Sequence, residues 1–310
     1  MNFTRRDFLR AAAALAASRS LVARGAEQLQ QVLAGESNAP VVWLQGQACS
    51  GCSVSLLNSV YYTTIDDLLL NRIDLQFHAT LMAATGQLAS DAAMAAQATP
   101  GYVLVVEGAI PTGASGKYCQ LWPGMTMLNA VQTFSVNAGW ILAVGACAAY
   151  GGIPGGSMNI TVGGTPNPTG AVPVSGVIGT PSKLINIPGC PAHPDWIVGT
   201  ILYLLEHGTA PALDTNRRPT MFYGNRIHDY CSERRKHCTK KFANRLGEEG
   251  CLQRVGCKGE RTYSDCYSRK WNSGAANTYG VNWCIGARTP CHGCVEPEFP
   301  DGMSPFFLDG

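Results

Sequence analysis

The stretch VVWLQGQACSGC, residues 41–52, joins an apolar run to a pair of cysteines. Its apolar part, Val41–Leu44, stops just before Gly46 and predicts a short buried strand of a parallel sheet. Similar runs predict further strands at Ile73–His78, Tyr102–Val106, Trp140–Val144 and Leu184–Ile187. Helices are expected among them at Ser53–Val60, Ala89–Ala98 and Pro194–His207. Strands that alternate with helices predict an α/β fold with a doubly wound parallel sheet.

Four cysteines come directly after the carboxyl ends of predicted strands. Cys49 and Cys52 follow the first strand, Cys147 follows the fourth, and Cys190 follows the fifth. Open α/β sheets bind their ligands at this edge, so we expect these four side chains to meet. Glycines beside them, such as Gly145, would let the backbone approach a bound cluster closely.

The last third of the chain carries two more groups of four potential metal ligands. The second group is His228, Cys231, Cys251 and Cys257, and the third is Cys266, Cys284, Cys291 and Cys294. Four soft ligands suit a cubane iron–sulfur cluster, and a histidine can replace one cysteine. Zinc is the alternative metal for any single group. Three such sites in one chain favour a path for electrons over a single reaction centre.

The distribution of charge predicts two domains. Residues 30–216 contain three basic and nine acidic side chains, whereas residues 217–270 contain fourteen basic and six acidic ones. We therefore expect an α/β domain at 38–216 and a C-terminal domain at 217–310. The second has little hydrophobic periodicity, so it should be small and irregular and depend on metal clusters for its stability.

The N-terminus predicts export. TRRDFL, residues 4–9, is a twin-arginine pattern, and a short apolar stretch follows it, so we expect a signal segment at about residues 1–26. Exported proteins often pair their cysteines in disulfides. Thirteen cysteines is an odd number, however, and the chain is long enough for a core without disulfides, so a disulfide framework is not expected. No other apolar run is long enough to span a bilayer, so no membrane span is expected.

Several motifs in a fixed order resemble the small, electron-transferring subunit of nickel–iron hydrogenases. Besides the twin-arginine start and the ligand block from His228 to Cys294, they are WLQGQACSGC (43–52), VEGAIP (106–111), GACAAYGG (145–152) and PGCPAHPDW (188–196). The match extends over nearly the whole chain. It implies a flavodoxin-like first domain, followed by an irregular domain that carries clusters.

The resemblance also assigns the ligands. It implies that the first group binds a proximal 4Fe–4S cluster, the second a distal 4Fe–4S cluster, and the third the medial cluster between them. In the common form of the family a proline stands where this chain has Cys284, and the medial cluster is 3Fe–4S. A fourth thiolate can hold a fourth iron, so we expect a medial 4Fe–4S cluster, with 3Fe–4S as the alternative. Cys284 and the ending CVEPEFPDG (294–302) are most similar to the nickel–iron–selenium branch.

The activity implied is that of a hydrogenase, an oxidoreductase that interconverts H2 with two protons and two electrons. This chain would relay electrons between the nickel–iron site of a large subunit, its partner in a heterodimer, and an external redox carrier. A multihaem cytochrome is one candidate for that carrier. The expected location is the periplasm, with membrane association through a partner as an option. The alternative is an exported, non-catalytic iron–sulfur electron carrier.

The remaining polar residues predict little further chemistry. No paired carboxylates or nucleophile–histidine arrangement stands out, so no catalytic residue is assigned in this chain. Glu107 is expected to hydrogen-bond backbone near the first group, as structural support. The basic run from Arg234 to Arg245 is either a solvated face or a docking surface for an acidic redox partner. Nucleic-acid binding is not expected, and Cys119 and Cys238 are left without a metal role.

Overall fold

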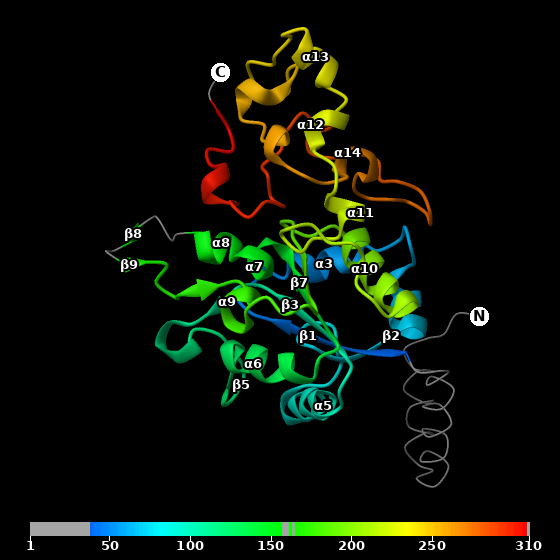
Figure 1. The fold of residues 1–310 in the computed structure, drawn as a ribbon, viewed down its shortest axis with the longest axis vertical. Coiled ribbons are helices and arrows are strands. Elements are labelled where there is room, and N and C mark those ends of the chain that lie inside the picture. The colour runs from blue at the N-terminus through cyan, green and yellow to red at the C-terminus, as the bar shows by residue number, and fades with distance from the viewer. Residues whose placement is uncertain (1–37, 157–160, 163–164, 309–310) are drawn as a thin grey trace, which may run out of the picture. The chain divides into compact units, whose positions relative to one another are not determined.

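The computed structural model describes residues 38–156, 161–162 and 165–308. The predicted signal segment lies outside these residues. Residues 39–310 form one compact unit, in which a central sheet is followed by a region of short helices and loops (Figure 1). The predicted boundary between residues 216 and 217 falls inside this unit and stays a prediction. None of the described helices is long and apolar enough to cross a membrane.

The central sheet has five parallel strands. In chain order they are β1 (Ala39–Gln45), β2 (Ile73–His78), β3 (Val103–Glu107), β7 (Trp140–Val144) and β11 (Leu184–Ile187). Their spatial order is β11-β7-β3-β1-β2, so the chain reverses direction across the sheet between β1 and β3. This order is that of flavodoxin-like folds and confirms the predicted doubly wound sheet.

Helices cover both faces of the sheet because successive strand residues point to opposite sides. Val41 and Trp43 pack into one core, with α3 (Gly51–Leu57) and α10 (Pro194–His207). Val42 and Leu44 pack into the other, with α5 (Gly86–Ala98) and α6 (Met127–Asn137). The sequence reading missed α6, and it placed the start of α3 two residues late.

Short elements connect and extend this framework. They are α4 (Ile65–Asp67), the π-helix η1 (Leu68–Arg72), β4 (Ile110–Pro111), η2 (Gly113–Gly116), β5 (Gln120–Trp122), β6 (Met125–Thr126), α7 (Gly145–Tyr150), α8 (Gly152–Gly155), β8 (Thr161–Val162), β9 (Thr165–Pro166), β10 (Ala171–Val172) and α9 (Val174–Ile178). Of these, α7 matters most here, because it begins at the carboxyl end of β7.

Past residue 217, regular structure is sparse. The elements are α11 (Thr220–Tyr223), α12 (Ile227–Tyr230), α13 (Arg234–Cys238), η4 (Leu252–Val255), η5 (Gly259–Arg261), α14 (Cys266–Arg269) and η6 (Asp301–Met303). Their core is small: seven buried residues, one of them Cys291, with Cys231, Cys257 and Cys266 packed around it. So few apolar side chains offset little of the entropy of ordering the chain, as the sequence predicted.

Buried ion pairs fasten this irregular region to the α/β framework. Arg218, before α11, contacts Asp214 at 2.7 Å and Glu296 at 3.1 Å. Arg269 at the end of α14 contacts Asp265 at 2.7 Å and Asp195 of α10 at 3.0 Å. Both guanidinium groups are buried, so each holds charges that would otherwise lie unpaired away from water.

Arg269→Ala should lower the free energy of unfolding by about 3–5 kcal/mol, because it leaves two buried carboxylates without their cation. The matched control is Arg261→Ala, which removes an exposed pair with Glu298 (3.6 Å) and should cost about 1 kcal/mol or less. Thermal unfolding of the metal-loaded protein measures both. Equal midpoints for the two variants would contradict the role given to Arg269.

Candidate metal centres

The structure brings the first group of cysteines together at the carboxyl edge of the sheet. Cys49 precedes α3, Cys52 lies in its first turn, Cys147 lies in α7, and Cys190 follows β11. The sulfur of Cys52 interacts electrostatically with those of Cys147 and Cys190, and the sulfur of Cys49 interacts with the same two. Three segments that are distant in sequence thus present four thiols to one place.

Glycine keeps the space among these sulfurs open. Gly145 has a φ of +88°, and a Cβ there would lie 2.6 Å from Sγ of Cys52. A Cβ on Gly51 would lie 3.1 Å from Sγ of Cys49. Backbone N–H groups also reach the sulfurs, since that of Ala192 donates to Sγ of Cys52 at 3.5 Å. The space and the donors fit a metal–sulfur cluster.

Burial raises the pKa of three of these thiols, those of Cys52, Cys147 and Cys190, and so favours their neutral form while no metal is bound. It raises the pKa of Cys147 to about 11, and it raises the pKa of Cys52 further. A thiol that stays protonated at neutral pH is a poor metal ligand, but a metal cation displaces its proton and binds the thiolate. The donor set is therefore suited to a cationic cluster.

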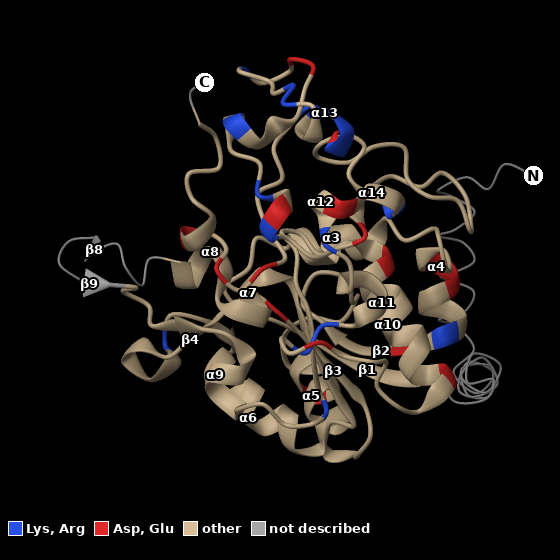
Figure 2. Ribbon diagram, turned by 45° about the horizontal axis from the view of Figure 1, so that its top comes forward, with Lys and Arg blue, Asp and Glu red and all other residues tan. Residues whose placement is uncertain are grey.

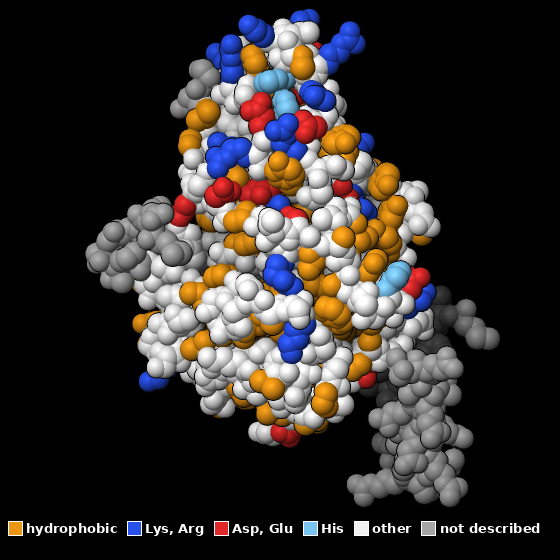
Figure 3. Space-filling view, in the orientation of Figure 1, with side chains coloured by type: hydrophobic (Ala, Val, Ile, Leu, Met, Phe, Trp, Pro, Cys, Tyr) orange, Lys and Arg blue, Asp and Glu red, His pale blue; other side chains and the backbone are white. Residues whose placement is uncertain are grey.

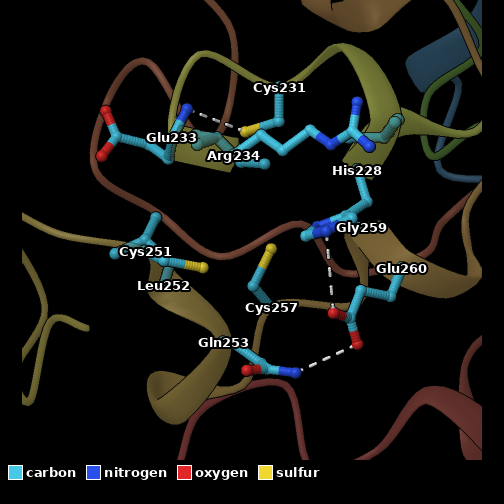
Figure 4. A pocket seen from close by; sticks show the side chains of 12 residues that line it. His228, Cys231, Glu233, Arg234, Cys251, Leu252, Gln253, Cys257, Gly259 and Glu260 are labelled. Atoms are coloured by element: carbon cyan, nitrogen blue, oxygen red, sulfur yellow. Dashed lines mark hydrogen bonds and ion pairs between the residues drawn. The ribbon is translucent and has the colours of Figure 1, made fainter. Parts of the chain in front are cut away.

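The second group surrounds a partly open pocket, shown in Figure 4. His228 comes from α12 and Cys231 follows that helix, while Cys251 and Cys257 flank η4. The three thiols point into the pocket, with His228 at its edge (Figure 4). The N–H of Glu233 donates to Sγ of Cys231 at 3.4 Å, and burial raises the pKa of this thiol to about 11.

The third group is the most enclosed. Cys266, Cys291 and Cys294 interact electrostatically with one another, and burial raises the pKa of Cys294 to about 12. The hydroxyl of Ser264 donates to Sγ of Cys266 at 3.0 Å. Cys284 lies at the edge of this group, where it is exposed and interacts with Cys294. The structure therefore brings all four predicted residues into one neighbourhood.

Contacts between ligands show that the third group lies between the other two. Cys190, from the first group, and Cys294, from the third, pack against the same small core of Ala146, Phe299 and Met303 and interact electrostatically. The N–H of Cys291, from the third group, donates to Sγ of Cys257 of the second group, at 3.4 Å. The spatial order is first, third, second, which the chain order does not reveal.

All thirteen cysteines are described, and all are free thiols. Cys119 is half-buried against the core beneath α6, and Cys238 is exposed on α13, so neither joins a group. The sequence reading missed a contact of His228 with Glu260 (3.9 Å) and of the same carboxylate with His237 (3.3 Å). His237 stands in the basic run, and no spacing pattern marked it as a neighbour of a predicted ligand.

A doubly wound sheet beside three adjacent groups of soft ligands defines a class of cysteine-rich proteins with several candidate metal sites in a row. Comparison with known proteins narrows this class. Residues 49–204 match the family described as the 20 Kd subunit of NADH ubiquinone oxidoreductase. Residues 223–307 match the family described as the C-terminal part of the NiFe/NiFeSe hydrogenase small subunit.

Individual relatives agree over most of their length. The chain is 40% identical to the periplasmic [NiFeSe] hydrogenase small subunit of Desulfomicrobium baculatum, with 88% of each chain covered. It is 38% identical to the quinone-reactive Ni/Fe-hydrogenase small chain of Wolinella succinogenes, covering 97% of this chain and 83% of the relative. The solved [NiFeSe] hydrogenase of Desulfovibrio vulgaris Hildenborough superimposes with a TM-score of 0.78 at 42% identity, covering 89% and 99%. The chain belongs to the family of NiFe/NiFeSe hydrogenase small subunits.

Gly145→Ala should abolish metal binding by the first group, because the new methyl carbon would occupy the space beside Sγ of Cys52. The matched control is Gly101→Ala, with a φ of +103° but no atom within 4 Å of the added Cβ. Both variants carry the same backbone strain. Iron per chain should fall only in Gly145→Ala, and an equal loss in both would show that strain alone is responsible.

Proposed function

We propose that this chain is the electron-transfer subunit of a heterodimeric hydrogenase. It would relay electrons between a nickel–iron site in a large subunit and an external carrier, in the reaction H2 = 2 H⁺ + 2 e⁻. The observation that supports this most is the series of neighbouring ligands, from Cys190 to Cys294 and from Cys291 to Cys257. Three ligand groups next to one another are what a relay requires.

The ligands of the three sites are proposed as the sequence predicted them. The proximal site would use Cys49, Cys52, Cys147 and Cys190; the medial site Cys266, Cys284, Cys291 and Cys294; and the distal site His228, Cys231, Cys251 and Cys257. Iron–sulfur clusters bound there would supply one-electron redox centres. The chain itself would hold the clusters in order and exclude water from the middle site. Its backbone N–H groups would donate hydrogen bonds to the cysteine sulfurs that bind the clusters.

Cys284 decides which cluster the medial site holds. Cys284 interacts electrostatically with Cys294 of the third group and with Cys257 of the second, and the first of these interactions supports a fourth iron ligand there. A thiolate at this position adds a donor that proline cannot provide, so we propose 4Fe–4S rather than 3Fe–4S. Cys284 is the one exposed cysteine of this group, so its thiolate would close the site on the solvent side.

The twin-arginine pattern supports export to the periplasm, and the printed names of relatives from Desulfomicrobium baculatum and other organisms describe them as periplasmic. Attachment to a membrane would then come through a partner subunit. Relatives are named as small subunits or small chains, which supports a large subunit as the first partner.

The surface around the second group supports an acidic electron carrier. We define the basic cap as the exposed side chains of Arg234, Arg235, Lys240, Lys241 and Arg245. No Asp or Glu occurs from residue 234 to residue 247. Figures 2 and 3 show Lys and Arg gathered around α13, the helix that follows Cys231. Positive charge at the exit would attract an acidic partner and repel a basic cytochrome.

Iron and acid-labile sulfide per chain, with EPR of an anaerobically oxidised sample, test the proposed function. Three 4Fe–4S clusters give about twelve irons and no three-iron signal. Cys284→Pro should lose about one iron, gain the sharp signal of an oxidised three-iron cluster, and raise the medial reduction potential. The control is Cys238→Ser, outside all three groups, which should change nothing. Zinc in place of iron would contradict the proposal, and an unchanged Cys284→Pro would contradict the medial assignment alone.

Charge reversal within the basic cap tests whether this surface docks the electron carrier. Lys241→Glu combined with Arg245→Glu should slow H2-driven reduction of an acidic ferredoxin roughly tenfold at low salt, because steering is electrostatic. The difference should shrink as salt rises. Reduction of the small dye methyl viologen and the variant Lys117→Glu, on the sheet domain, serve as controls. Faster reduction of the acidic carrier by the variant would reject the basic cap as its docking surface.

A further inference from the structure

Glu107 stands beneath the loop that carries two ligands of the first group. It is the last residue of β3, the neighbour of β1 at the point where the strand order reverses, and it is only 2% exposed. The sequence reading gave it a structural role. Glu107 accepts more hydrogen bonds than that role needs, and it donates none.

Five donors converge on this one carboxyl group. Oε1 accepts the backbone N–H of Cys52 at 3.0 Å and that of Ser53 at 3.2 Å. Oε2 accepts Nε1–H of Trp43 at 3.0 Å, Nε2–H of Gln45 at 3.1 Å and the hydroxyl of Ser53. A carboxylic acid would have to donate one proton, but every contact here is a donation to Glu107. The arrangement fits the ionised carboxylate.

No ion pair joins Glu107 to a Lys, Arg or His side chain among the residues that the structure describes. His78 is the nearest candidate, since its Nε2 contacts the hydroxyl of Ser53 at 3.1 Å. Its Nδ1 accepts the N–H of Thr80 at 3.2 Å, so Nε2 carries the proton, and burial lowers the pKa of His78 to about 4. The imidazole is therefore neutral at pH 7, and the negative charge stays uncompensated.

The Glu107 carboxylate also accepts a hydrogen bond that the N-cap residue of a helix usually accepts. The first N–H groups of a helix lack partners within the helix, and a side chain at the N-cap usually accepts from one of them. At α3 the N-cap Ser50 makes no such bond. Glu107, 55 residues away in sequence, accepts from Cys52 instead. The two N–H groups that it binds are thereby withdrawn from donation to a cluster at this end of the sheet.

We propose that Glu107 is a positioning residue that lowers the reduction potential of the proximal cluster by placing a fixed negative charge behind its ligand loop. Its charge acts on the sulfurs of both Cys52 and Cys147, which lie on different segments of the site. Fixed negative charge in a poorly screened interior opposes the addition of an electron, and so favours the oxidised form of a nearby cluster. This inference rests on the proposed assignment of a cluster to the first group.

Glu107→Gln removes the charge with little change of shape. Its amide oxygen can still accept from the N–H groups of Cys52 and Ser53, whereas its NH2 group replaces the acceptor of Trp43 and Gln45 and can only donate to the hydroxyl of Ser53. In the complete heterodimer, we expect iron per chain to be unchanged and the proximal potential to shift positive in an EPR-monitored redox titration. The medial and distal potentials should stay where they are. Glu107→Ala also removes the acceptor, so it should lose iron from the first site.

Two controls separate charge from structure. Asp74→Asn removes one negative charge from the exposed side of β2 and should leave the potential unchanged. Ser53→Ala breaks the link to His78 but keeps the charge, so its shift should be smaller than that of Glu107→Gln.

An unshifted potential in Glu107→Gln, or an equal shift in Ser53→Ala, would overturn the inference and leave the relay intact. Loss of iron in Glu107→Gln, with an unshifted potential in the molecules that keep it, would make Glu107 purely structural and also overturn the inference. An unmodified protein with no iron in the first site would instead overturn the proposed function.

Discussion

For the first group to hold a cluster, four sulfur atoms from distant segments must surround one small volume, and other protein atoms must leave that volume empty. The parallel sheet meets the first condition, because the carboxyl ends of β1, β7 and β11 lie at one edge. Gly145 meets the second, since a Cβ there would touch Sγ of Cys52. The third group adjoins this one where Cys190 and Cys294 pack together, and the second group adjoins the third through the hydrogen bond from Cys291 to Cys257.

The irregular region has a small apolar core and a high density of candidate metal ligands. Three of its partly buried core neighbours are cysteines, so metal binding and packing stabilise the same residues. Its attachment to the sheet is electrostatic as well as apolar. Arg218 and Arg269 each form ion pairs with two carboxylates, and such pairs fix orientation because few other arrangements satisfy buried charges. Glu107 is treated differently: dipoles alone stabilise it, and its charge remains to act on the first group.

Much of the fold was predictable because each buried strand is a continuous apolar run. The bounds of β2, β7, β11 and α10 agree with the structure residue for residue. The helix α6 was missed because its apolar residues (Ala130, Val131 and Phe134 among them) are interrupted by polar ones. Glu107 was recognised as a partner of backbone near the cysteines. Its five donors lie within residues 43–53, but they could not be assigned to Glu107 from the sequence, because only folding brings that stretch beside the end of β3.

The sequence by itself determined the strand positions, the twelve candidate ligands and their division into three groups, because these depend on local pattern and residue type. Only the tertiary structure decided the order of the groups in space. Cys266 to Cys294 come last in the chain yet lie in the middle, between Cys190 and Cys257. It also decided that Glu107 carries an unpaired charge, since the absence of a cation beside it depends on long-range packing. Spacing along a chain records which side chains are available, whereas their neighbours are fixed by how the segments pack.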